Sequence, residues 1–111
     1  GVVFFDFNKT VLKAEAETVL SDFFTKTDIE NIDSILVQGH TDSVGTEERN
    51  NELSLQRSTA VIRWLQQLNI VGANRIKAQA FGKSRPVATN TTTEGRAANR
   101  RVEIIIFRRG L

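Results

Sequence analysis

Two side chains of opposite charge stand where they can act on one ligand. Asp42 follows the apolar segment 34–39, which is typical of a strand, and Arg57 lies early in the next predicted helix. A carboxylate accepts hydrogen bonds from an ammonium group, whereas a guanidinium binds a carboxylate in a bidentate manner that lysine cannot reproduce. The pair therefore suits a zwitterion, such as the α-amino-acid centre of a larger molecule.

Arg57 interrupts an otherwise apolar stripe of its helix. The stripe runs at helical spacing through LSLQRSTAVIRWLQQL and contains Leu53, Arg57, Val61, Leu65 and Leu68. Three structural explanations stand beside ligand binding. Asp42 can simply form a turn, Arg57 can bury its stem and extend its charge into water, or the two can form an ion pair with each other.

The elements that position this pair follow from hydrophobic periodicity. We predict strands at residues 2–7, 34–39, 75–82 and 100–107, helices at about 13–26 and 50–68, and a long loop at 83–99. This order predicts a two-layer α/β (α+β) fold, βαβαββ, with the helices packed on one face of a mixed sheet. Ligand-binding groups gather beyond the carboxyl ends of strands in α/β sheets, which brings Asp42 and the start of the second helix together.

Length and composition limit the classes of function. The chain has 111 residues, a formal net charge of +2 and no cysteine. We expect one domain, 1–111, cut from a longer protein, without thiol chemistry or disulfides. His40 is the only histidine, and a metal site needs three or four ligands, so we expect no metal and no cofactor. Within these residues we expect neither a signal peptide nor a membrane span, because no apolar run is long enough to cross a membrane.

Three separated motifs resemble the OmpA-like C-terminal domain family, which includes peptidoglycan-associated lipoproteins and flagellar stator tails. They are VVFFDFNK, GHTDSVGTEERNNELSLQRSTAVIRWL and AFGKSRPVATNTTTEGRAANRRVEI, and together they cover nearly the whole chain. Asn8 stands where many members have aspartate, and Lys13 and Ala14 stand where many have a proline. The resemblance implies non-catalytic binding of peptidoglycan through the diaminopimelate of its stem peptide.

The same resemblance implies a role for each residue of the site. Asp42 would bind the ammonium group of diaminopimelate and Arg57 its carboxylate. Main-chain N–H groups around residues 5–7 would help to cradle a carboxylate, and Arg101 would brace the loop. The full set of implied ligand-binding residues is Asp42, Arg57, Asn50, Thr41, Phe5, Asp6, Phe7, Leu53 and Arg100.

The resemblance also implies a location. The domain would tether an envelope protein to the cell wall in a Gram-negative periplasm, with membrane attachment only through other parts of that protein. Two alternatives stay open: the same fold could bind another envelope protein, or the chain could be a small RNA-binding α/β module. The C-terminal arginines favour the latter, but the basic patch is small and lacks exposed aromatic residues for stacking, so we expect no nucleic-acid partner.

Overall fold

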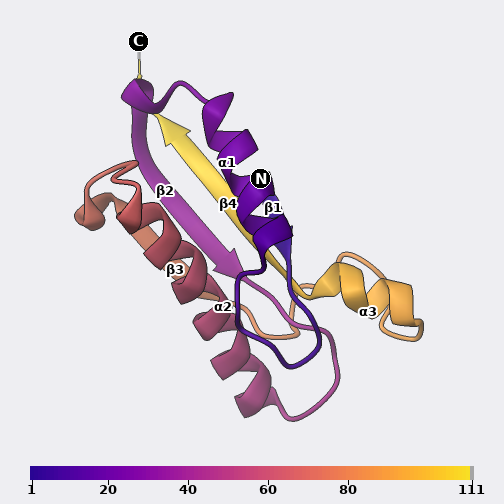
Figure 1. The fold of residues 1–111 in the computed structure, drawn as a ribbon. Helices are drawn as coiled ribbons and strands as arrows, with labels where there is room; N and C mark the ends of the chain where they lie inside the picture. The colour runs from indigo at the N-terminus through magenta and orange to yellow at the C-terminus, as the bar shows by residue number, and fades with distance from the viewer. Residues whose placement is uncertain (111) are drawn as a thin grey trace.

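The computed structural model describes residues 1–110, which form a four-stranded sheet with two long helices and one short helix (Figure 1). The strands are β1 (Val2–Phe4), β2 (Ile32–Gly39), β3 (Ile76–Ala80) and β4 (Arg101–Arg108). The α-helices are α1 (Ala14–Thr25), α2 (Glu47–Gln67) and α3 (Thr93–Asn99). Single 3₁₀ turns, Ile29–Asn31 and Ala73–Arg75, precede β2 and β3.

The sheet is mixed, with the strand order β1-β4-β2-β3. β2 and β3 are parallel, and α2 makes the crossover between them, whereas β4 is antiparallel to both β1 and β2. The last strand thus inserts between the first two strands of the sequence. As a result, the carboxyl end of β2 lies next to the start of β4, with Gly39 opposite Val102.

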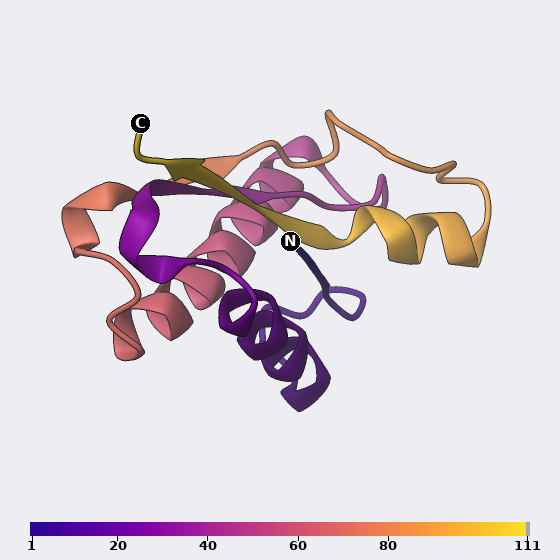
Figure 2. The same cartoon turned by 90° about the horizontal axis from the view of Figure 1, so that it is seen from above.

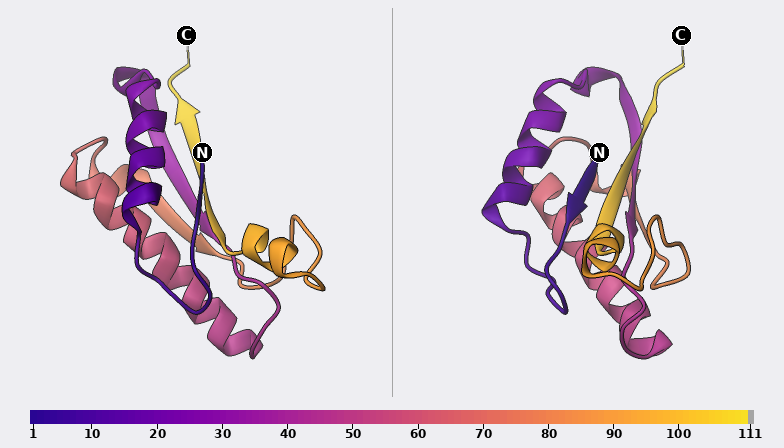
Figure 3. Two further views of the ribbon diagram at one scale, coloured as in Figure 1. Left: turned by 45° about the vertical axis from the view of Figure 1, so that its right-hand side comes forward. Right: turned by 90° about the vertical axis from the view of Figure 1, so that its right-hand side faces the viewer.

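Both long helices cover the same face of the sheet (Figures 2 and 3). Alternate residues of the strands point to this face and pack against α1 and α2, as period-2 alternation requires. The core contains Val3, Phe5, Ala16, Leu20, Phe24, Ile32, Ile35, Val37, Val61, Leu65, Val102 and Ile104. The prediction of a mixed sheet with helices on one face is confirmed.

The short helix α3 was not expected, because its segment was predicted to be a loop. It lies beyond the end of the sheet, away from α1 and α2 (Figure 1). Thr92 caps its N-terminus, accepting a hydrogen bond from the Gly95 N–H at 3.0 Å. The helix carries no apolar stripe that periodicity could detect, so capping is its only local signal.

The ends of several elements also differ from the prediction. Helix α2 begins at Glu47 rather than near residue 50, because Thr46 caps it by accepting from the Arg49 N–H at 3.1 Å. Strand β1 ends at Phe4 rather than residue 7, although the Phe5 N–H still bonds to the Arg100 carbonyl at 2.9 Å. Strand β3 ends at Ala80, shortly before Gly82 turns the chain with φ +55°.

Helix α2 approaches the end of β2 closely at Gly39. A Cβ atom at this position would lie 2.0 Å from the Ser54 carbonyl oxygen and 2.5 Å from Ser58 Oγ. Ser54 and Ser58 also form hydrogen bonds to β3 and the residues after it. Ser54 Oγ accepts from the Gly82 N–H, and Ser58 Oγ donates to the Gln79 carbonyl. Small residues on both sides therefore seat the first half of α2 directly against the strand ends.

Candidate functional site

A small cavity of about 180 Å³ lies where the ends of the strands meet the first turns of α2. We call it the Asp42–Arg57 cavity, after the two side chains that the sequence analysis paired. It is lined by Phe7, Asn8, Thr41, Asp42, Val44, Gly45, Arg49, Asn50, Leu53, Arg57 and Arg100. The fold thus brings together seven of the nine residues that the sequence analysis assigned to the site.

Arg57 is fully buried in the floor of this region, with 1% of its surface exposed. Its Nε donates to the Lys9 carbonyl at 3.0 Å, Nη1 to the His40 carbonyl at 3.1 Å and Nη2 to the Asp6 carbonyl at 3.1 Å. A guanidinium has five N–H groups, so each Nη keeps one more for another acceptor. The burial excludes the alternative in which Arg57 extends its charge into water.

Arg57 is charged at neutral pH despite its burial. Burial lowers the pKa of Arg57 to about 10; the negative charge of Asp42 opposes this change, while Arg100 and Arg49 add to it. The side chain also lies against the ring of Phe5, with its central carbon 5.4 Å from the ring centre. The cavity therefore offers a permanent, desolvated positive charge, which binds anions more strongly than an exposed one.

Asp42 is also buried, and its partner is Arg100 rather than Arg57. Asp42 Oδ2 lies 3.3 Å from Arg100 Nη1, and Oδ1 accepts from the Val44 N–H at 3.0 Å. Arg100 in turn donates from Nε to the Phe5 carbonyl at 3.0 Å. The alternative in which Asp42 and Arg57 serve only to pair with each other is therefore wrong.

Asn50 supplies the clearest sign of a missing partner in the cavity. Its side chain is 1% exposed, and its Nδ2 has no hydrogen-bond partner among residues 1–110. A buried donor without an acceptor costs about 1–3 kcal/mol, so such groups are uncommon in folded proteins. An acceptor that enters the cavity would relieve this cost.

Thr41 and Leu53 complete the buried part of the lining. The Thr41 N–H bonds to the Gly82 carbonyl at 2.9 Å, and Thr41 Oγ1 donates to the Asp42 carbonyl at 2.9 Å. The first of these bonds ties the end of β2 to the residues after β3. Leu53 is 5% exposed and provides an apolar wall between the polar groups.

The first-strand side of the site differs from the expectation for residues 5–7. The Phe5 N–H donates to the Arg100 carbonyl and is not free to cradle a ligand carboxylate, while the same role for the N–H groups of residues 6 and 7 stays a prediction. Phe5 and Asp6 do not line the cavity; instead, their carbonyl oxygens accept hydrogen bonds from Arg100 and Arg57. Only Phe7 of these three residues reaches the cavity, and its side chain is exposed.

Sequence reasoning missed four residues at the mouth of the cavity, namely Asn8, Val44, Gly45 and Arg49. Asn8 has φ +56°, a left-handed conformation that asparagine tolerates better than most residues. The Arg49 Nη2 donates to Asn8 Oδ1 at 3.0 Å and so joins the loop after β1 to α2. The capping signal of Thr46 would have placed Arg49 in the first turn of α2, beside Asn50.

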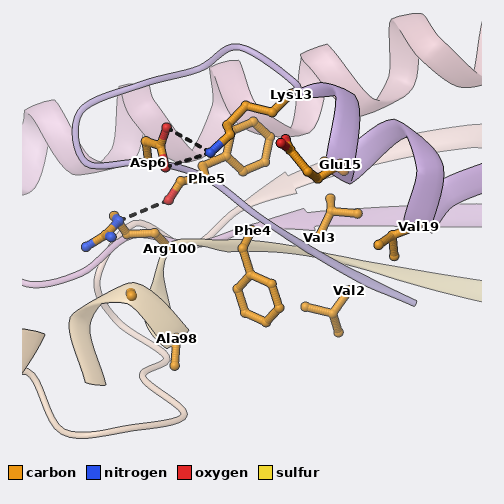
Figure 4. A pocket seen from close by; sticks show the side chains of 12 residues that line it. Val2, Val3, Phe4, Phe5, Asp6, Lys13, Glu15, Val19, Ala98 and Arg100 are labelled. Atoms are coloured by element: carbon orange, nitrogen blue, oxygen red, sulfur yellow. Dashed lines mark hydrogen bonds and ion pairs between the residues drawn. The ribbon is translucent and has the colours of Figure 1, made fainter. Parts of the chain in front are cut away.

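A larger groove of about 610 Å³ lies between β1 and α1 (Figure 4). Its walls are mainly apolar, and Val2, Phe4 and Val19 contribute exposed side chains. The charged pair Asp6–Lys13, at 3.3 Å, is exposed at its edge. Arg100 borders both hollows, but Asp42 and Arg57 do not reach this groove.

The long loop between β3 and α3 is held by two buried side chains. Asn99 Oδ1 accepts from the N–H groups of Val87 and Ala88, and Asn99 Nδ2 donates to the Ala88 carbonyl at 2.9 Å. Arg101 donates to the Arg85 carbonyl at 3.0 Å, which confirms its expected role as a brace of this loop. The loop is thus attached to the start of β4.

His40 supports the site from behind through its main chain. Its carbonyl accepts from Arg57, and its N–H donates to the Arg101 carbonyl at 2.9 Å. The ring stacks on Phe81 with centres 5.3 Å apart, and both ring nitrogens lack hydrogen-bond partners within the described chain. Burial and the charge of Arg101 lower the pKa of His40 from 6.5 to about 4, an effect that Glu103 partly offsets.

We predict that His40 makes the domain less stable in mild acid. The folded state resists protonation of His40 until about pH 4, whereas the unfolded chain takes up the proton near pH 6.5. The contribution of neutral His40 to the free energy of unfolding is therefore fully present above pH 6.5 and declines as the pH falls toward 4. Urea unfolding at pH 7 and pH 5 should show a loss of about 2 kcal/mol in the free energy of unfolding.

His40→Leu provides the comparison, because leucine fills a similar volume without a titratable group. The variant should lose distinctly less stability than the parent between pH 7 and pH 5. Equal losses in the two proteins would show that His40 is not responsible.

Within residues 1–110, no helix combines the length and apolar character needed to cross a lipid bilayer.

Comparison with known proteins identifies the family. Residues 4–100 match the family described as "OmpA family". Outer membrane protein A of Bordetella avium is 43% identical over 103 residues, which cover 93% of this chain and 53% of that protein. The chain thus spans about half the length of this curated relative.

Solved structures give the same result. The peptidoglycan-associated lipoprotein from Burkholderia pseudomallei superposes with a TM-score of 0.83 and 32% identity, covering 96% of this chain and 89% of that one. The cell wall anchor of the T6SS from Pseudomonas aeruginosa gives a TM-score of 0.75 and 29% identity, with coverages of 97% and 80%. In sequence and in fold, this chain belongs to the OmpA family.

Proposed function

We propose that this domain binds peptidoglycan without cleaving it, and that the Asp42–Arg57 cavity holds the zwitterionic centre of diaminopimelate. The observation that carries the proposal is the set of buried polar groups in one small cavity. It contains the carboxylate of Asp42, the guanidinium of Arg57 with N–H groups to spare, and the amide nitrogen of Asn50, which has no hydrogen-bond partner among the described residues. An α-amino-acid centre carries the complementary charges within a few bonds.

Each charged group has one task in this complex. The oxygens of Asp42 accept from the ligand ammonium, while Arg100 and the Val44 N–H keep the carboxylate oriented. The free N–H groups of Arg57 and the Nδ2 of Asn50 donate to the ligand carboxylate. Hydrogen bonds to charged groups contribute about 1.5–3 kcal/mol each, which gives selectivity without very tight binding.

Modest affinity suits the role of a tether. The solved relatives include a protein named as peptidoglycan-associated and another named as a cell wall anchor. The cell wall repeats its stem peptides over a large surface, so a domain held near it by its parent protein works at a high effective concentration. In this proposal the domain lies in the periplasm and attaches a longer envelope protein to the wall.

The proposal predicts that Asp42→Asn weakens binding to purified cell-wall sacculi roughly tenfold or more, the loss of one charge-assisted contact. Asparagine keeps the size of the side chain but removes the charge that holds an ammonium group. The measurement is co-sedimentation of the purified domain with sacculi over a range of concentrations.

Asp33→Asn is the matched control, since Asp33 is an exposed residue on β2 that does not line the cavity. It should sediment like the parent. Undiminished binding by a correctly folded Asp42→Asn protein would refute the assignment of the cavity. Absence of sedimentation by the parent itself would refute peptidoglycan binding altogether.

A further inference from the structure

The Asp42–Arg57 cavity carries more positive charge than a zwitterion needs. Its lining includes three guanidinium groups, from Arg49, Arg57 and Arg100, but only one carboxylate, that of Asp42. A zwitterionic centre brings one charge of each sign and leaves this excess unchanged. The charge balance therefore points to a ligand with a further negative group.

The contacts identify which of the three arginines has no strong partner within the described part of the chain. Arg100 is paired with Asp42 at 3.3 Å and with the Phe5 carbonyl, and Arg57 is held by three main-chain carbonyls. Arg49 has only a neutral partner inside the cavity lining, Asn8 Oδ1 at 3.0 Å. Its one ion-pair partner among residues 1–110 is Glu52 at 3.7 Å, and the two side chains are 42% and 60% exposed, so this pair contributes little.

The position of Arg49 is unfavourable for a structural cation. It lies in the first turn of α2, where the helix dipole disfavours positive charge, and it is one of the charges that lower the pKa of Arg57. Glu47 and Glu48 in the same turn are exposed and do not line the cavity. The hydrogen bond to Asn8 holds the guanidinium at the mouth of the cavity despite this cost.

We propose that Arg49 binds a second carboxylate of the ligand, and that the domain thereby prefers stem peptides in which this carboxylate is free over those in which it is amidated. The inference rests on the proposed function, because the zwitterionic centre must first occupy the cavity. In diaminopimelate that is acylated at one amine and ends its stem peptide, the acylated centre carries such a second carboxylate. Arg49, at the rim between α2 and the loop after β1, is the specificity-determining residue.

Two probes test this proposal directly. Both are diaminopimelate acetylated at one amine; in one the acylated centre keeps its carboxylate, and in the other it is a carboxamide. Isothermal titration of the full chain should show about fivefold tighter binding of the carboxylate probe, the effect of one half-exposed charge pair. In Arg49→Gln the preference should fall to near unity, because the variant no longer distinguishes the carboxylate from the carboxamide.

Arg63→Gln is the matched control, since Arg63 is exposed further along the same helix. It should keep the full preference. Equal binding of the two probes by the parent overturns the role of a second carboxylate. A preference that persists in Arg49→Gln overturns the role of Arg49. Either result leaves the proposed function standing. Failure of both probes to bind the parent overturns the proposed function and this inference together.

Discussion

Replacing Arg57 with lysine is expected to weaken binding to cell-wall sacculi by about 100-fold or more, since two charge-assisted hydrogen bonds to the ligand carboxylate are lost. A lysine keeps one positive charge but cannot reach the Asp6, Lys9 and His40 carbonyls together. The loop after β1 therefore loses its anchor as well. The measurement is co-sedimentation with sacculi, accompanied by urea unfolding.

The unfolding measurement separates the two roles of Arg57. Its partners in the protein are main-chain carbonyls, so we expect a stability loss of a few kcal/mol together with the loss of binding. Arg63→Lys, on an exposed turn of the same helix, should change neither quantity. A folded Arg57→Lys protein that bound sacculi like the parent would show that the guanidinium serves the fold alone.

Replacing Gly39 with alanine is expected to destabilise the domain by more than about 3 kcal/mol, at or above the usual cost of overpacking. The added Cβ would lie 2.0 Å from the Ser54 carbonyl oxygen, which belongs to the backbone of α2 and cannot rotate away. The helix must move off the strand ends, and Leu53, Asn50 and Arg57 move with it. Thermal or urea unfolding measures the loss, and sacculus binding should fall in parallel.

Gly72→Ala is the control for this substitution. Gly72 has φ −61°, which alanine adopts freely, and the nearest atom to an added Cβ is a side-chain oxygen of Asn74 at 3.0 Å. The free energy of unfolding of the Gly72→Ala variant should stay within about 0.5 kcal/mol of the parent value, as is usual for surface substitutions. A Gly39→Ala protein as stable as Gly72→Ala would mean that α2 is not seated on β2 as described.

Periodicity predicted the sheet and the two long helices because each of them buries an apolar face. The stripe from Leu53 to Leu65 is buried in the structure, whereas Leu68 is 53% exposed beyond the end of the core. Helix α3 and the first turn of α2 bury little and depend on caps by Thr92 and Thr46, so periodicity did not detect them. The insertion of β4 between β1 and β2 is a long-range pairing that local patterns do not encode.

The candidate site was predictable where charge and strand position coincide, as at Asp42 and Arg57. The pairing of Asp42 with Arg100 could not be predicted. Arg100 directly precedes β4, and it lies beside Asp42 only because β4 is next to β2 in the sheet. The Asn8–Arg49 hydrogen bond depends on the left-handed turn at Asn8. The parts of the site that could not be predicted are therefore contacts between residues that are distant in sequence.

The most direct test follows side-chain nitrogens of the ¹⁵N-labelled domain during titration with a diaminopimelate-containing stem peptide. The signals of Asn50 Nδ2 and Arg57 Nε should shift together and saturate with one dissociation constant, and Asp42→Asn should abolish or greatly weaken both responses. Shifts confined to the groove residues Val2, Phe4 and Val19, with Asn50 and Arg57 unaffected, would contradict the assignment of the ligand to the Asp42–Arg57 cavity.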